Sequence, residues 1–158
     1  METTMTTPNG PGPSREEQVR RQVLAWQRSF VAKDVDAMMS FYAPTGFTAF
    51  DLMPPLEFHG GEMWRENWVR FFASFEGGIE LEFADLEIQA GGDLAFMRAM
   101  VHLAGVMNGT AIDTWVRQTN CFRLIDDEWL MIHDHVSWPT DFATGQSLMG
   151  LVPSMAQR

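Results

Sequence analysis

Apolar residues recur at helical spacing in two segments of the first half of the chain. The apolar stripe of the first segment consists of Val19, Val23, Trp26 and Phe30. Ser14 and Glu17 form a capping-box pattern ahead of this stripe, so the pattern predicts a helix from Ser14 to about Lys33. Asp34 can cap a second, shorter helix. That helix must end before Pro44, because the residue preceding a proline avoids helical dihedral angles.

A third helix is predicted by a second aromatic stripe. Its residues fall at i, i+4, i+7 and i+8 and are Trp64, Trp68, Phe71 and Phe72. The pair Gly77-Gly78 is expected to close this helix. Before it, "GFTAFD" predicts a short strand and "LMPPLEFHGG" predicts a loop, since Pro54 and Pro55 cannot lie in the centre of a sheet.

After Gly78 the apolar pattern changes to an alternation with a period of two. Ile79 and Leu81 alternate with acidic residues, and a change of parity near Ala84-Asp85 predicts a bulge or bend. Residues 94–106, 110–125 and 128–138 predict three long strands, joined by turns at "MNG" and "DDE". Helices followed by an antiparallel sheet indicate an α+β domain with the helices on one face of the sheet. We expect one domain over residues 14–158, preceded by a disordered tail at residues 1–13.

The composition indicates a bulky interior and argues against nucleic acid and anionic membranes as binding partners. The 158 residues include 12 Phe, 6 Trp and 12 Met, which can fill a core or line a ligand cavity. A formal net charge of −10 disfavours binding to nucleic acid and to anionic membranes. Cys121 is the single cysteine, so no intrachain disulfide can form. The chain shows neither a signal-peptide pattern nor a long apolar run, so we expect a soluble, cytoplasmic protein.

Two histidines near the C-terminus are the first candidates for chemistry. In "LMIHDHVSWPTD", His133 and His135 lie two positions apart, so a strand would present both imidazoles on one face. A metal site would need a third ligand, and neither His59 nor His102 has a spacing that supplies one. No metal is therefore expected. Proton transfer, substrate binding and a satisfied core position remain open for the pair.

The quoted segments "WQRSFVAKDVDAMMSFYA", "FDLMPPLEFHGGEMWRENWVRFF" and "VRQTNCFRLIDDEWLMIHDHVSWPTD" resemble the nuclear transport factor 2-like superfamily. The resemblance is to its SnoaL-like and ketosteroid-isomerase-like bacterial members and covers about residues 15 to 142. It implies a cone, in which a curved antiparallel sheet wraps around three N-terminal helices and leaves an apolar pocket. It also implies a homodimer and a small apolar ligand, with no cofactor. On this picture His133, His135 and Ser137 face the pocket.

Aligning Asp34 and Tyr42 with helix residues of the isomerase suggests where its catalytic groups would fall. Trp26 takes the place of the oxyanion tyrosine, and Asn120 takes that of the second oxyanion donor. The base falls at Phe50, or at Asp51 if the strand holds one more residue. Desolvation would raise the pKa of Asp51 and suit it to be a general base, with His133 and His135 carrying protons and Asn120 polarising a carbonyl group. In the alternative, Asp51 caps the following loop in solvent.

The expected wall of the pocket consists of Trp26, Phe30, Trp64, Trp68, Met97, Arg117 and Phe122. By alternation Arg117 lies on the face opposite to Asn120, so only one of them can point inward unless a bulge intervenes. The leading interpretation is a SnoaL-like domain that binds a small molecule. As an enzyme it would be of the isomerase or cyclase type and would move protons on a small apolar carbonyl compound. The alternative is a non-catalytic ligand-binding or association module.

Overall fold

The computed structural model describes residues 12–154, so most of the predicted tail at residues 1–13 lies outside the described part of the chain. This part of the chain contains three α-helices, which are α1 (Arg15–Val31), α2 (Val35–Met39) and α3 (Gly61–Ala73). The four long strands are β3 (Phe75–Gly91), β4 (Leu94–Met107), β5 (Thr110–Ile125) and β6 (Glu128–Ser137). The short strands are β1 (Thr48–Phe50), β2 (Phe58–His59), β7 (Thr140–Asp141) and β8 (Gln146–Ser147).

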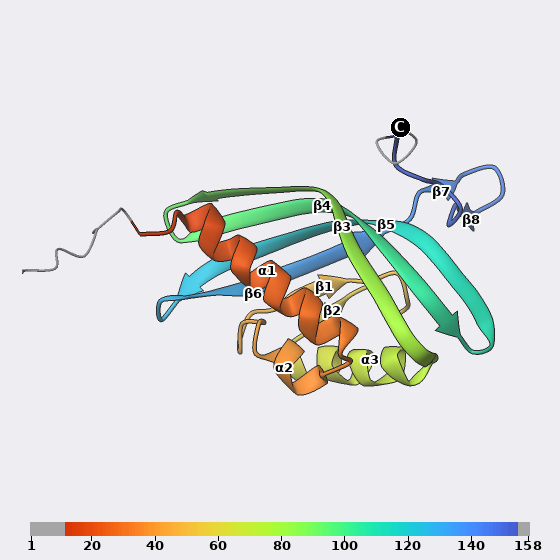
Figure 1. Cartoon of the computed structure of the whole chain (residues 1–158), viewed down its shortest axis with the longest axis horizontal. Coiled ribbons are helices and arrows are strands. Elements are labelled where there is room, and N and C mark those ends of the chain that lie inside the picture. The colour runs from red at the N-terminus through yellow and green to blue at the C-terminus, as the bar shows by residue number, and fades with distance from the viewer. Residues whose placement is uncertain (1–11, 155–158) are drawn as a thin grey trace, which may run out of the picture.

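One curved sheet and three helices on one side of it make up the α+β fold, which confirms the predicted class (Figure 1). The strand order is β2-β1-β6-β5-β4-β3, and β7 and β8 form a separate two-stranded sheet. The large sheet differs from the prediction in being mixed, because β1 runs parallel to β6. Alternation of apolar residues shows which side of a strand is buried, but it carries no information on the direction of the neighbouring strand.

The predicted helix starts are confirmed by their caps. Ser14 and Glu17 form both hydrogen bonds of the capping box on α1, and Asp34 accepts a hydrogen bond from the Ala37 N–H at the start of α2. The end predicted for the third helix is wrong. Helix α3 ends at Ala73, and Gly77 lies instead in a bulge of β3 with φ of 70°. A glycine adopts this left-handed conformation without steric cost, so it serves a bulge as well as a helix end.

The interior is a continuous cluster of aromatic and aliphatic side chains between α1, α3 and the sheet. The predicted stripe of α1 is buried, and so are Trp64, Trp68 and Phe72 of the α3 stripe. Edge-to-face contacts connect the two helices, with the rings of Phe30 and Trp68 5.7 Å apart. The predicted bulge near Ala84-Asp85 is also confirmed, since the register between β3 and β4 shifts between Ala84 and Glu87. None of the described helices is both long and apolar enough to cross a membrane.

Gly105 of β4 tests how tightly the bulged end of β3 packs on its neighbour. A Cβ atom added at Gly105 would lie 3.0 Å from two ring carbons of Phe75 and 3.2 Å from the Gly78 carbonyl oxygen. We therefore expect Gly105→Ala to lower the free energy of unfolding by about 1–3 kcal/mol in urea titrations. Gly91→Ala is the matched control, because nothing lies within 4 Å of the added atom there. Equal stability of the two variants would contradict the packing described.

Candidate active site in the cone

A cavity of about 550 Å³ lies between the helices and the concave face of the sheet. Its wall is mainly apolar and aromatic, with contributions from Trp26, Phe30, Trp64, Trp68, Phe71 and Trp138. Two carboxyl groups, Asp51 and Asp134, also line it. A largely apolar hollow with a few polar groups is the usual form of a small-molecule site.

A bulge in β6 decides which side chains of the last long strand face this cavity. Cys121 of β5 pairs with His133, whereas the next residue, Phe122, pairs with Met131, so Ile132 is an extra residue in β6. One extra residue moves all following side chains to the other face. Trp129 and Met131 therefore face inward before the bulge, and Asp134 and Val136 face inward after it.

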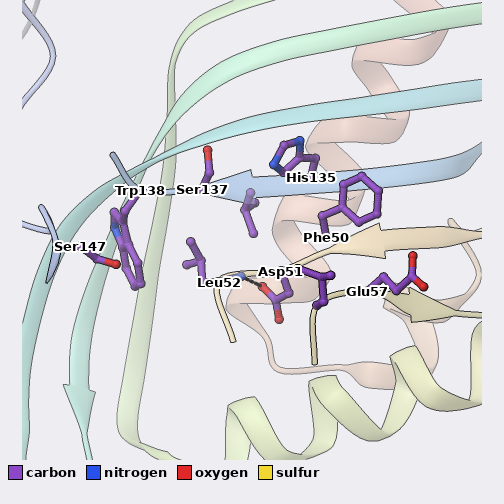
Figure 2. A pocket seen from close by; sticks show the side chains of 10 residues that line it. Phe50, Asp51, Leu52, Glu57, His135, Ser137, Trp138 and Ser147 are labelled. Atoms are coloured by element: carbon purple, nitrogen blue, oxygen red, sulfur yellow. Dashed lines mark hydrogen bonds between the residues drawn. The ribbon is translucent and has the colours of Figure 1, made fainter. Parts of the chain in front are cut away.

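The prediction that His133 and His135 face the pocket is therefore wrong. The two rings lie on the outer side of the sheet, where both contact the ring of Phe50 with centroid distances of 4.7 and 5.5 Å. Figure 2 shows the rings of Phe50 and His135 on one side of the strands and the Asp51 carboxyl group on the other. The pKa of His133 is lowered by burial and by the nearby His135, and its Nδ1 lies 2.8 Å from the Thr48 hydroxyl. Neither imidazole reaches the cavity.

Asp51 follows β1 and points toward α3. Its carboxylate accepts hydrogen bonds from the Asn67 side-chain amide at 2.8 Å and from the Leu52 N–H at 2.7 Å. Burial raises the pKa of Asp51 above its usual value, and these two hydrogen bonds offset part of the increase. The bond from Leu52 is the loop-capping interaction expected in the alternative, but the side chain lies in the cavity wall and is not left in solvent. Its role as a base stays a prediction.

Asp134 is the most strongly perturbed carboxyl group of the site. Burial raises its pKa from 3.8 to about 7, and the negative charge of Asp51 adds to the increase. The Gln118 side-chain amide donates a hydrogen bond to it at 3.2 Å, and the neighbouring Asn120 amide also favours the ionised form. Asp134 therefore holds its proton to a higher pH than an exposed aspartate does, and the negative charge of Asp51 favours this protonated form.

Tyr42 is buried close to Asp134 and to three tryptophans, Trp26, Trp64 and Trp68. The Trp26 indole N–H donates to the Tyr42 hydroxyl at 2.8 Å. Burial and the charge of Asp134 raise the pKa of Tyr42 well above its usual value, although the indole groups of Trp64, Trp26 and Trp68 lower it in part. The N–H groups of Trp64 and Trp68 are buried and form no hydrogen bond within residues 12–154. The tyrosine therefore stays protonated.

The remaining predicted site residues, which are the wall residues and the proposed carbonyl-polarising Asn120, divide into three groups. Trp26, Phe30, Trp64 and Trp68 line the cavity as expected. Met97, Phe122 and Asn120 point inward but are buried in the core beyond the cavity wall, where the Asn120 amide contacts the sulfur of Met131 at 3.3 Å. Their assignment to the pocket is wrong, because side-chain packing fills the part of the cone in which they lie.

Arg117 is wrongly assigned as well. It lies on the outer face and donates a hydrogen bond to the Ser137 hydroxyl at 3.1 Å. Cys121 shares that face, and burial raises the pKa of its thiol. Among residues 12–154, no three histidine, cysteine or acidic side chains come together in an arrangement that could hold a metal ion.

A second hollow of about 490 Å³ opens on the surface beside the cavity (Figure 2). The two hollows share four wall residues, Asp51, Leu52, Val136 and Trp138. The Trp138 indole N–H is fixed by a hydrogen bond of 3.1 Å to the Thr114 hydroxyl, which itself donates to the Met149 carbonyl group at 2.7 Å. Asp51 therefore borders both hollows, and Phe50 and His135 line the outer one.

Sequence reasoning missed Asp134 and Gln118, although both are visible in the printed sequence. Alternation placed Asp134 on the outer face, because it lies between His133 and His135, which were assigned to the inner face. The signal that could have identified it is a change of parity along the strand. The large apolar residues Trp129 and Met131 stand at odd positions, whereas Val136 and Trp138 stand at even ones, which indicates an extra residue between Met131 and Val136.

Comparison with known proteins places the chain in a family. The model of the SnoaL-like domain matches residues 19–141, so the chain belongs to the SnoaL-like family. No protein with a curated description matches it significantly in sequence.

Solved structures give the same fold. An NTF2-like protein of unknown function from Pseudomonas putida is similar with a TM-score of 0.80 and 26% identity, covering 87% of this chain and 96% of that one. An NTF2-like superfamily protein from Salmonella enterica has a TM-score of 0.71 and 17% identity, over 84% and 96% of the two chains. A candidate dehydratase of the NTF2-like family from Streptomyces avermitilis has a TM-score of 0.68 and 18% identity, over 77% and 93%.

The raised pKa of Asp134 predicts a specific dependence of stability on pH. Between about pH 4 and pH 7 the folded protein keeps a proton on Asp134 that the unfolded chain has released, so this group makes the protein less stable as the pH rises. The advantage of Asp134→Asn over the wild type should therefore grow by about 1.4 kcal/mol per pH unit across this window. Urea titrations at several pH values measure it.

Glu66→Gln is the control for this experiment, because Glu66 lies exposed on α3. Its difference from the wild type should stay constant over the same pH range. A constant difference for Asp134→Asn would show that Asp134 titrates like an exposed aspartate and would contradict the electrostatics described.

Proposed function

We propose that the protein binds a small, mostly apolar carbonyl compound in the cone and moves protons on it with Asp51 and Asp134. The observation that carries this proposal is the pairing of two carboxyl groups with raised pKa values in the wall of a large aromatic cavity. Groups perturbed in this way concentrate at functional sites.

The two environments suggest a division of roles. Asp51 keeps two hydrogen bonds that favour its ionised form, so it is the better base. Asp134 is almost completely buried and holds its proton to about pH 7, so it is the better acid. Two carboxyl groups whose surroundings separate their pKa values are a known arrangement for acid–base catalysis, and ketosteroid isomerase uses carboxyl groups tuned in this way.

In the proposed reaction Asp51 removes a proton from the carbon next to the carbonyl group. The electron pair of that C–H bond forms the enol double bond, while Asp134 donates its proton to the carbonyl oxygen. Return of a proton to a different carbon completes an isomerisation, and loss of a neighbouring hydroxyl group as water completes a dehydration. The similarity to the candidate dehydratase agrees with this class of chemistry. General acid–base catalysis of this kind contributes roughly 10²–10⁴-fold in rate.

Exchange of carbon-bound protons tests the proposal without knowledge of the natural substrate. Indanone, tetralone and related cyclic ketones are incubated with the protein in D₂O, and loss of the α-proton signal is followed by NMR. We expect exchange above the buffer rate for at least one ketone, and a decrease of roughly a hundredfold or more in Asp51→Asn, because an amide cannot accept the proton.

Asp113→Asn serves as the control for that substitution, because the Asp113 side chain is 80% exposed on the outer side of the sheet. It should exchange protons at the wild-type rate. An Asp51→Asn protein as fast as the wild type would overturn the proposed role of the base, and a panel that neither binds nor exchanges would overturn the proposed function.

A second role, association into a homodimer, is favoured by the outer face of the sheet. Phe50 and Phe96 are 41% and 39% exposed there, although both are large and apolar. The pairing of Phe96 with Cys121 and of Cys121 with His133 places these residues in one row across β4, β5 and β6. An exposed apolar area of this kind is typical of an interface, and identical copies can cover it with a twofold axis.

Substitution of Phe96 by a charged residue tests this assembly. We expect the wild type to sediment as a dimer at micromolar concentration and Phe96→Glu to sediment as a monomer, because two buried carboxylates would face each other near the axis. Glu82→Gln, on an exposed position of β3, should leave the mass unchanged. A monomeric wild type would exclude the dimer.

A further inference from the structure

The cavity has a second polar region at the C-terminal end of α3, one helical turn beyond Asn67, whose amide binds Asp51. There the last turn of α3 meets the turn between β4 and β5, and the wall residues are Arg70, Ser74 and Asn108. The Asn108 N–H donates to the Ser74 carbonyl oxygen at 2.9 Å, which fixes the two segments together. Arg70 precedes Ser74 by four residues, so both lie on the same side of the helix end.

Arg70 is the one cationic residue in the cavity wall formed by residues 12–154. Its guanidinium group pairs with no acidic side chain in that part of the chain, whereas Arg65 on the same helix pairs with Asp36. Asp51 is not its partner either, since burial, Asn67 and the Leu52 N–H account for the pKa of that carboxyl group. Arg70 is therefore a cation at the cavity rim with free hydrogen-bond donors.

The surroundings of Arg70 favour an anionic group. Lys33 lies near the same end, where its amine donates hydrogen bonds to the carbonyl groups of Phe75 and Gly77. The chain as a whole has a net charge of −10, and the inner part of the cavity holds two carboxyl groups. Within the described part of the cavity wall, Arg70 is therefore the residue that attracts an anionic group of a ligand, and this attraction would also fix the direction in which the ligand lies.

We propose that Arg70 binds the carboxylate of the ligand, so that the natural substrate is an apolar carboxylic acid. This inference rests on the proposed function and narrows its substrate class to keto acids, whose carbonyl group lies at Asp51 and Asp134 and whose carboxylate lies at Arg70. The apolar middle of the molecule contacts Trp68 and Phe71, which line the cavity on the same helix. The planar guanidinium fork can hold a carboxylate with two parallel hydrogen bonds.

Competition between two matched ligands tests this site. N-phenylnaphthylamine, a neutral dye that fluoresces in apolar surroundings, serves as the reporter of the cavity. Naphthylacetate and naphthylacetamide are added as competitors, since they share one apolar body and differ only in a carboxylate against a neutral amide. In the wild type the carboxylate should displace the dye at a roughly three- to tenfold lower concentration than the amide. Added salt should reduce this preference, because the cation is exposed.

In Arg70→Gln the carboxylate and the amide should displace the dye at the same concentration, and the concentration needed for the amide should equal that of the wild type. Arg65→Gln is the matched control, because it removes a cation from the same helix outside the cavity wall, and it should keep the wild-type preference. Thermal melting curves of both variants verify that they are folded.

The possible failures of this experiment are distinguishable. Two results would overturn the carboxylate site and leave ligand binding in the cone intact. One is displacement of the dye by both competitors at equal concentration in the wild type, and the other is a preference for the carboxylate that persists in Arg70→Gln. A cavity that takes up neither the dye nor either competitor overturns the proposed function and the carboxylate site together.

Discussion

The extra residue at Ile132 is the constraint on which the rest of the structure depends. Before it, Trp129 and Met131 are buried in the core, and after it Asp134 and Val136 line the cavity. Without the bulge the same strand would turn two imidazoles inward and leave the aspartate in solvent. Because side chains in a strand alternate with a period of two, this one extra residue turns Asp134 toward the interior and His133 and His135 toward the exterior.

Desolvation is the second physical factor in the site. The aromatic wall that makes the cavity suitable for an apolar ligand also withdraws water from Asp51 and Asp134, so both carboxyl groups hold protons more tightly than exposed ones. The amides of Asn67 and Gln118 limit this effect without adding charge. Holding two carboxyl groups in one apolar space lowers the folding stability near neutral pH, a compromise that is common at functional sites and agrees with the proposed roles of acid and base.

The distribution of charge along the cavity gives it a direction. Its two acidic residues, Asp51 and Asp134, lie where β1 and β6 run side by side. Arg70, the one cationic residue of the wall within residues 12–154, lies in the last turn of α3. A ligand that presents a carbonyl group to the first end and an anion to the second would fit both. The outer face of the sheet, with Phe96 and His133, lies opposite this cavity and is the face proposed for association, whereas Phe50 and His135 also line the second hollow beside Asp51. The two faces of one sheet therefore support different proposed roles.

The sequence by itself determined the helices, their caps and the long strands, because these follow from local spacing and from short-range hydrogen bonds such as that of Ser14 with Glu17. It also identified the four aromatic residues of the wall, since a helical stripe of Trp and Phe has to face the core, whereas Asp51 was suggested by the family resemblance and lies in the wall as well. The tertiary structure decided the direction of β1, the inward position of Asp134 and the outward position of His133, His135 and Arg117. Each of these depends on register between strands far apart in the chain, and a bulge of one residue reverses the assignment without a clear mark in the local sequence.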